Sequence, residues 1–205
     1  MKYDWKIYTI VNHGLGEKIA RLTRIAGARG GTILVGRGQI DSPILRTLAL
    51  ADIEKDVLIT LVNDNQLDEV IKLIKELHFY KHKNDDMIFV VPTGEKEMKD
   101  ETPHEMISII VNRGYADDIM KEARKAGALG GTILNARGTG KPTDEKFFGI
   151  TIVPEKEELI ILAESATAPA IREAIEALPC LTTPGIGIMY TTPVKQFSVL
   201  GKKGS

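Results

Sequence analysis

The sequence has little that would crosslink a fold or anchor it in a membrane. Cys180 is the single cysteine among 205 residues, so no disulfide can form within the chain, and such usage is typical of a reducing cytoplasm. No apolar run approaches the about 18 residues that a membrane-spanning helix needs. The polar start at residues 1–6 lacks the apolar core of a secretory signal. We therefore expect a cytoplasmic protein without membrane insertion.

An excess of charge of one sign is also missing. Residues 1–100 carry 15 basic and 15 acidic side chains, and residues 101–205 carry 12 and 13. A broad basic surface is the electrostatic footprint of nucleic-acid binding. Since neither half of the chain has such an excess, we expect no nucleic-acid partner.

The strongest feature that is present is an internal repeat. Residues 10–38 align without a gap with residues 110–138, and 16 of the 29 positions are identical. Further along, DVLITLV at 56–62 is matched with ELIILAE at 158–164. This repetition indicates a tandem duplication, and two copies are too few for a solenoid.

Composition suggests where the two copies are joined. The segment 94–104, GEKEMKDETPH, is charged and lacks apolar periodicity, as linkers do. The predicted organisation is a first domain at 1–93, a linker at 94–104, a second domain at 105–195 and a flexible tail at 196–205.

Apolar periodicity predicts six elements in the first repeat. One helix follows the first strand and ends at Gly27, and a second helix begins near Asn63. The order β-α-β-β-α-β predicts an α+β fold, with two tandem ferredoxin-like sandwiches and antiparallel sheets. The strands are expected at 5–11, 32–36, 57–62 and 87–91.

Several of these strands are apolar at consecutive positions instead of alternating with polar residues. This pattern indicates sheets that are buried on both faces. In so small a unit the second face needs another copy to cover it, from the other repeat or from another chain. We therefore expect a homo-oligomer or close packing between repeats.

The connection between the second and third strands is longer than a hairpin requires, at 39–55 and again at 139–157. The first copy is apolar and is expected to contain a helix, whereas the second is polar and charged. We expect Ile44, Leu45 and Leu48 to contact a protein partner. Alternatively, both connections pack against the neighbouring unit.

Two segments resemble the P-II nitrogen-regulatory signalling proteins. Residues 26–39, AGARGGTILVGRGQ, resemble the stretch that enters the family's long recognition loop, and residues 182–191, TTPGIGIMYT, resemble its glycine-rich loop. The resemblance implies a non-enzymatic regulator of nitrogen metabolism that forms trimers. It also implies ATP or ADP as a regulatory ligand between subunits, with no required cofactor. Expected partners are a transporter, an enzyme or a transcription factor.

The resemblance also implies candidate ligand-binding residues. Glycine amides can form a nest for phosphate, and arginine adds charge-assisted hydrogen bonds. The candidates are Thr32, Gly36, Arg37, Gly38 and Gln39 in the first repeat and Thr132, Arg137, Gly138, Gly185 and Gly187 in the second. Ile188 stands where the family has a lysine, and Lys195 is the one basic residue near the end of the last strand.

No catalytic or metal-binding pattern stands out. His78 and His82 are four residues apart, but no third ligand is evident. Cys180 is expected to be a small buried residue. The acidic pairs at 85–86 and 157–158 are expected to lie in solvated turns. We therefore expect no enzymatic activity and no metal site.

Two other functions fit the same sequence. A binding or scaffold protein that has lost ligand sensing would keep the repeated glycines for tight turns and close packing. An amino-acid-binding regulatory module of the ACT type shares the order of strands and helices. The response to nucleotides or to free amino acids separates these possibilities.

Overall fold

The computed structural model describes residues 3–40, 52–78, 86–94, 102–138, 146–147, 150–151, 155–183 and 186–200. Within these ranges, no helix is long and apolar enough to cross a membrane.

The chain divides into two compact units, each of which combines segments that are distant in the sequence. Unit 1 contains the chain up to Gly36, the segment Ile53–Glu105 and the chain from Thr192 onward. Unit 2 contains Met106–Thr191 together with the segment that begins at Arg37. The two repeats therefore correspond to two folded units. However, the segment that begins at Arg37 in the first repeat counts with unit 2, and the chain from Thr192 onward counts with unit 1.

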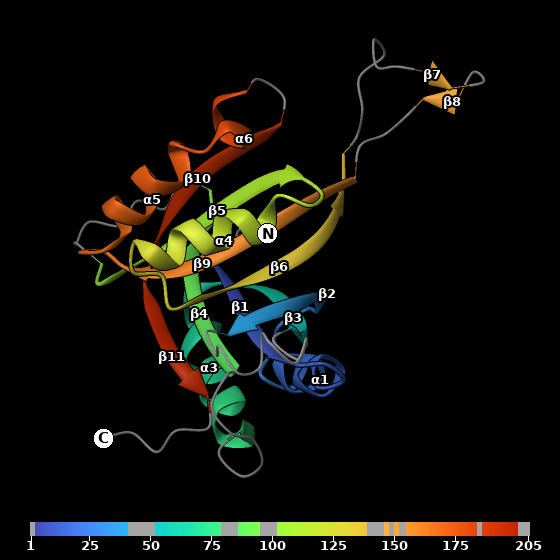
Figure 1. Ribbon diagram of the computed structural model, residues 1–205. Helices are drawn as coiled ribbons and strands as arrows, with labels where there is room; N and C mark the ends of the chain where they lie inside the picture. The colour runs from blue at the N-terminus through green and yellow to red at the C-terminus, as the bar shows by residue number, and fades with distance from the viewer. Residues whose placement is uncertain are drawn as a thin grey trace. The chain divides into compact units, whose positions relative to one another are not determined.

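Unit 1 has the predicted order of strands and helices (Figure 1). Its elements are β1 (Trp5–Asn12), α1 (Gly16–Ile25), β2 (Gly31–Ile40), β3 (Asp52–Val62), α3 (Asp64–His78), β4 (Asp86–Pro92) and β11 (Gln196–Leu200). Residues 31–36 of β2 count with this unit, and residues 37–40 count with unit 2.

Unit 2 repeats the order, with a small addition in its long connection. Its elements are β5 (His104–Asn112), α4 (Ala116–Lys125), β6 (Gly130–Arg137), β7 (Lys146–Phe147), β8 (Ile150–Thr151), β9 (Glu155–Glu164), α5 (Ala168–Glu176), α6 (Pro179–Thr182) and β10 (Gly187–Val194). The short strands β7 and β8 pair only with each other, as an antiparallel hairpin in the second connection.

The sheet order confirms the predicted fold class. In unit 1 the order is β2-β3-β1-β4, and in unit 2 it is β6-β9-β5-β10. In both units the first and third strands in sequence are therefore central. The pairs β1–β3, β1–β4 and β6–β9 are antiparallel. This is the ferredoxin-like α+β arrangement, present twice.

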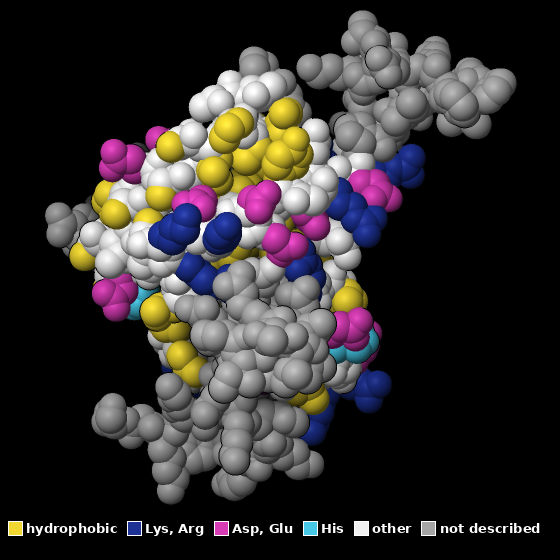
Figure 2. Space-filling model, viewed as in Figure 1, with side chains coloured by type: hydrophobic (Ala, Val, Ile, Leu, Met, Phe, Trp, Pro, Cys, Tyr) yellow, Lys and Arg dark blue, Asp and Glu magenta, His cyan; other side chains and the backbone are white. Residues whose placement is uncertain are grey.

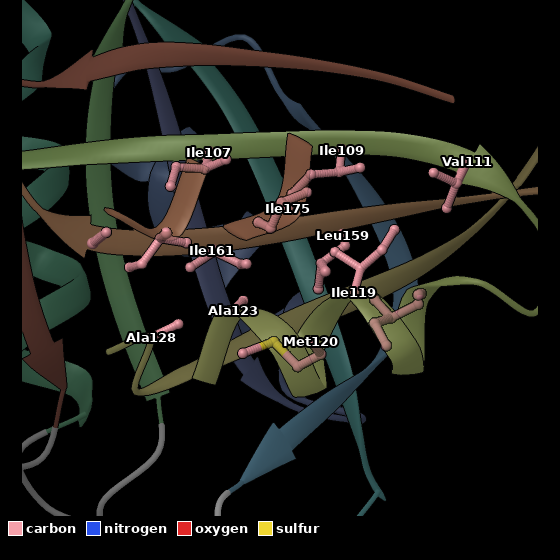
Figure 3. Packing of buried hydrophobic residues seen from close by; sticks show 14 of the residues in the cluster. Ile107, Ile109, Val111, Ile119, Met120, Ala123, Ala128, Leu159, Ile161 and Ile175 are labelled. Carbon is pink, nitrogen blue, oxygen red and sulfur yellow. The ribbon is translucent and has the colours of Figure 1, made fainter. Parts of the chain in front are cut away.

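Each unit has its own apolar core between the sheet and its two long helices. In unit 2, Ile107, Ile109 and Val111 of β5 face Ile119 and Met120 of α4, as Figure 3 shows. Alternate residues of β5 point to this core because side chains along a strand alternate between its faces. In unit 1 the equivalent core is built by β1, β3 and β4 with α1 and α3.

The second face of the strands is also buried in unit 1. Tyr8, Ile10, Phe89 and Val91 are at most 6 % exposed, although they lie outside the helix-side core. The rings of Tyr8 and Phe89 stack with centroids 4.9 Å apart. Burial on both faces agrees with the consecutive apolar residues in the sequence. Since these residues are buried within the single chain, they do not themselves require an oligomer, and the oligomer stays a prediction.

The helix ends agree with the sequence signals. The backbone N–H of Gln66 donates to the Asn63 side chain, and the N–H of Asn63 donates to the Gln66 side chain. This reciprocal pair is a capping box at the start of α3. Gly27 follows α1 with a φ of +91°, as a left-handed cap requires.

Two boundary predictions are wrong. The strand expected at 32–36 continues to Ile40, so β2 includes residues that were assigned to the long connection. The tail expected to be flexible from residue 196 instead forms β11, which pairs antiparallel with β4. The aromatic and β-branched residues of β11 pair with the edge of an existing sheet, and this stabilises a short strand that composition alone does not indicate.

Candidate ligand-binding site

The first turn of α4 is held by a buried carboxylate from β9. One oxygen of Glu157 accepts the backbone N–H of Gly114 at 3.0 Å and that of Ala116 at 3.3 Å. The side chain of Glu157 is 6 % exposed. A negative charge is favourable here because the first amides of a helix have no partners inside the helix and carry a partial positive charge.

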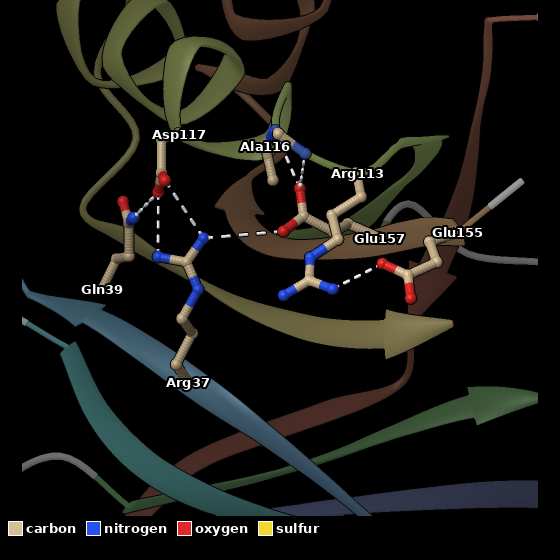
Figure 4. Close-up of polar contacts among 8 residues, drawn as sticks. Arg37, Gln39, Arg113, Ala116, Asp117, Glu155 and Glu157 are labelled. Carbon is tan, nitrogen blue, oxygen red and sulfur yellow. Dashed lines mark hydrogen bonds and ion pairs between the residues drawn. The ribbon is translucent and has the colours of Figure 1, made fainter. Parts of the chain in front are cut away.

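Arg37 joins this carboxylate to the surface of α4. Its two terminal nitrogens donate to the two oxygens of Asp117 at 3.0 and 3.1 Å, and one of them lies 3.8 Å from Glu157 (Figure 4). The amide of Gln39 also donates to Asp117. A guanidinium that meets a carboxylate with two parallel hydrogen bonds is among the stronger charged contacts in proteins. All four residues belong to unit 2.

A second ion pair lies beside this cluster. Arg113, in the turn before α4, donates to Glu155 at the start of β9. Both side chains are more than 60 % exposed. The hydrogen bond from Arg113 to Glu155 raises the pKa of Arg113 above its ordinary value.

Unit 1 contains the same helix-capping device with different partners. One oxygen of Asp56 accepts the N–H groups of Gly14 and Gly16, both at 2.9 Å. The other oxygen lies 2.7 Å from Nδ1 of His13. No arginine is part of this arrangement among the described contacts of Asp56. Asp56 and Glu157 are therefore equivalent positions of the repeat.

This equivalence corrects the sequence alignment by one residue. The match of 56–62 with 158–164 would pair Asp56 with Glu158, whereas the hydrogen bonds pair it with Glu157. The expectation of a solvated turn at 157–158 is wrong for Glu157, which is 5 % exposed as a residue. It is also wrong for Asp86, which is 2 % exposed and binds Lys55 at 3.0 Å.

The structure brings only part of the predicted ligand-binding set together. Arg37 and Gln39 meet at Asp117. Their neighbours Gly36 and Gly38 lie in the extended strand β2 and are buried, so the predicted glycine turn with a nest of amides is wrong at this position. Thr32 is also in β2, where it is exposed.

The second-repeat candidates are not gathered at one place. Thr132 is 4 % exposed and pairs with Ile160 inside the sheet. Arg137, at the end of β6, is exposed and has no ion-pair partner within the described part of the chain. Gly138 follows it outside the strand. Arg137 is therefore the one charged candidate that is accessible in this repeat.

Three of the glycines, among them the repeated pair Gly31 and Gly131, have a packing role. A Cβ atom on Gly31 would lie 2.8 Å from the carbonyl oxygen of Ile59, and one on Gly187 would lie 2.6 Å from Val111. A Cβ on Gly131 would meet Leu159 and the sulfur of Met120 at 2.8 Å. Close approach of neighbouring elements explains these glycines without any ligand.

Several predicted residues lie outside the described residues. They are Gly185 of the ligand-binding set, the partner-contact residues Ile44, Leu45 and Leu48, and His82 of the histidine pair. Within the described ranges, no group of three or more His, Cys, Asp or Glu side chains is arranged to hold a metal ion. Cys180 is buried in the core of unit 2, as expected, and burial raises the pKa of its thiol.

Asp117 and Glu157 are the residues that the sequence did not single out. Asp117 occupies the first turn of α4, where acidic residues are common for purely local reasons. The repeat pointed to the wrong residue for Glu157, because the acidic residue directly before the apolar run is Asp56 in the first copy and Glu158 in the second.

Residues 104–203 match the model of the family "Nitrogen regulatory protein P-II". The matched region covers the second repeat and β11. The C-terminal half of the chain is thus similar in sequence to the P-II family. No curated protein sequence matches the chain.

Two solved structures to which the chain is similar are distant from it in sequence. A putative monooxygenase from Fusobacterium nucleatum is 10 % identical, with 97 % of this chain and 96 % of that chain covered and a TM-score of 0.32. A chlorite dismutase variant from Candidatus Nitrospira defluvii is 7 % identical, with coverages of 94 % and 92 % and a TM-score of 0.24. At such TM-scores neither match supports a statement about activity.

Proposed function

We propose that the chain is a non-enzymatic, cytoplasmic signal-transduction protein of the P-II type in which both repeats are P-II-like domains. The observation that carries the proposal is the match of residues 104–203 to the P-II family. The first repeat shares 16 of 29 positions with the matched half and has the same strand order. Nitrogen metabolism is the process that such a protein regulates.

The proposed ligand is an adenine nucleotide, ATP or ADP, or a related small anion. Arg37 and Gln39 support this choice, because they converge on one point next to the start of α4. Arg137 offers a second, exposed guanidinium. These side chains supply the charge-assisted donors that phosphate groups require. The nucleotide acts as a regulatory ligand and not as a required cofactor.

The proposed partners are other copies of the chain and a regulated protein. Both faces of β1 and β4 are buried in unit 1, whereas Ile188 and Tyr190 of β10 are 60 % and 44 % exposed in unit 2. An apolar surface of this kind supports a homo-oligomer, and we favour a trimer. A transporter, an enzyme or a transcription factor is the regulated partner. On the face shown in Figure 2, basic and acidic side chains are intermingled, so nucleic acid is not a proposed partner.

A second candidate is a scaffold protein that has lost ligand sensing. The observation that favours it is the packing role of Gly31, Gly131 and Gly187. In this case the repeated glycines preserve the fold of each unit, and Arg37 serves only to fix residues 37–40 against α4.

Thermal unfolding with millimolar ATP, ADP or AMP separates the two candidates, because a ligand that binds only the native state raises Tm. Free amino acids at the same concentration test an ACT-type response. A rise in Tm with ATP or ADP, lost in Arg37→Met, supports nucleotide sensing. The absence of a shift with any nucleotide would leave the scaffold function, and a shift with amino acids alone would favour the ACT type. Light scattering after gel filtration tests the trimer.

A further inference from the structure

The guanidinium of Arg37 is already neutralised by the protein. It makes two hydrogen bonds to Asp117 and lies 3.8 Å from Glu157. One positive side chain thus faces two negative ones, and Gln39 also donates to Asp117. In this arrangement the cluster does not attract an anion, although its donors suit one.

The two carboxylates differ in how easily they can leave Arg37. Glu157 is 6 % exposed and is fixed by two backbone N–H groups at the start of α4. Asp117 is 57 % exposed, and its carboxylate accepts hydrogen bonds from Arg37 and Gln39. Asp117 can therefore turn into solvent at low cost, whereas Glu157 cannot move without uncovering the helix start.

We propose that Asp117 is an internal competitor that occupies Arg37 until an anionic ligand displaces it. The inference rests on the proposed function, because it assigns the ligand's phosphate to the position that the Asp117 carboxylate fills. Both groups present oxygen atoms in a geometry that a guanidinium fork recognises. Asp117 thus weakens the resting affinity for nucleotide and couples ligand binding to release of residues 37–40 from α4.

The repeat offers a matched control for this role. Glu17 is the counterpart of Asp117 in the first turn of α1, where it is exposed and has no ion-pair partner among the described residues. Replacing either residue with its amide removes one negative charge from the first turn of a helix. Only Asp117→Asn removes a charge that faces Arg37.

The experiment measures the Kd of ATP, ADP and AMP by calorimetry for the full chain and its variants at one ionic strength. We expect Asp117→Asn to lower Kd by about two- to fivefold, which corresponds to the free energy of a partly exposed ion pair. Glu17→Gln should leave Kd unchanged. In Arg37→Met/Asp117→Asn the gain should vanish, because the competitor acts through Arg37. Circular dichroism confirms that each variant is folded.

The outcomes separate the inference from the function on which it rests. If the wild-type chain binds nucleotide and Asp117→Asn binds equally or more weakly, the competitor role is refuted and nucleotide sensing remains. An equal gain in Glu17→Gln would also refute it, since general charge would then explain the effect. Binding that appears only in Asp117→Asn supports the role directly. If neither protein binds any nucleotide, the proposed function and the inference both fail.

Discussion

The two units bury the same lysine in different surroundings. In unit 1, Lys55 is 3 % exposed, donates to Asn12 at 2.8 Å and pairs with Asp86 at 3.0 Å. In unit 2, Lys156 donates to Asn112 at 2.6 Å, and the carbonyl oxygen of Ile186 stands where unit 1 has Asp86. The fold thus preserves the donor and its asparagine partner, while the contact with a buried aspartate in unit 1 corresponds to a contact with a backbone carbonyl in unit 2.

This difference shows how duplication relaxes a constraint. A buried ion pair is costly to break because either partner alone leaves an uncompensated charge. Lys55 and Asp86 form such a buried pair in unit 1, so neither can be replaced alone without a large cost. Lys156 is less buried than Lys55, so its replacement is expected to cost less.

Breaking this lysine contact has the largest expected effect. Lys55→Met should lower the free energy of unfolding by about 3–5 kcal/mol, because it leaves Asp86 buried without its cation. Lys156→Met should cost less, about 1–2 kcal/mol, since Lys156 is less buried than Lys55 and loses hydrogen bonds to Asn112 and to the carbonyl of Ile186. Urea unfolding measures both. Trp5, the single tryptophan and a core residue of unit 1, reports the first variant by fluorescence, and circular dichroism follows the second. Equal losses of stability in Lys55→Met and Lys156→Met would contradict the difference between the two units.

The second largest difference between the units is expected at the paired glycines Gly31 and Gly131. In Gly31→Ala the new Cβ would lie 2.8 Å from the backbone oxygen of Ile59, whereas in Gly131→Ala the nearest atoms are the ends of Leu159 and Met120. Side-chain ends can move and a backbone in a sheet cannot. We expect losses of about 2–3 kcal/mol for Gly31→Ala and about 1 kcal/mol for Gly131→Ala, as for overpacked cores. Matched urea titrations test the order, and a larger loss for Gly131→Ala would reverse our interpretation.

The residues that precede the second helix of each unit are expected to differ less in their contribution to stability. Asn63 caps α3 through its side chain, but Thr167 before α5 makes no capping hydrogen bond to the helix. Asn63→Ala should therefore cost about 1 kcal/mol, and Thr167→Ala should change stability by less than about 0.5 kcal/mol. The urea midpoints of the two variants provide the measurement. If both lose the same amount, the capping box contributes nothing specific.

The smallest expected effect is an increase in the free energy of unfolding. The hydroxyl of Thr60 in β3 is buried without a hydrogen-bond partner, and its counterpart in unit 2 is the apolar Ile161. Thr60→Val keeps the shape and removes an unsatisfied polar group, so stability should rise by about 0.5–1 kcal/mol. Thr60→Ser serves as the control, because it keeps the hydroxyl and loses a methyl group. A loss of stability in Thr60→Val would show that the hydroxyl has a partner.

Much of the fold could be read from the sequence because it depends on local signals. The capping box at Asn63, the left-handed Gly27 and the consecutive apolar residues of β4 each have a cause within a few residues. The order of elements then fixed the ferredoxin-like class. β11 could not be predicted in this way, because its pairing partner β4 is distant in the sequence.

The candidate site was harder to predict from the sequence for the same reason. Arg37 and Gln39 were identified as ligand-binding candidates from a resemblance, but their partner Asp117 is about 80 residues away and has an ordinary local explanation. The glycines of β2 suggested a phosphate nest, since composition does not distinguish a turn from an extended strand that contains glycine. Only the structure shows that the donors of Arg37 are occupied.

The strand β11 has a consequence for how the protein is made. It completes unit 1 at the edge of β4, yet it is translated about 100 residues after β4. During synthesis the nascent first unit therefore leaves the ribosome with one edge of its sheet unpaired, and such edges are prone to pairing with other chains. The sheet of unit 1 can be completed only after residues 196–200 have been synthesised, so a segment that follows the second repeat determines when the first repeat is protected from aggregation.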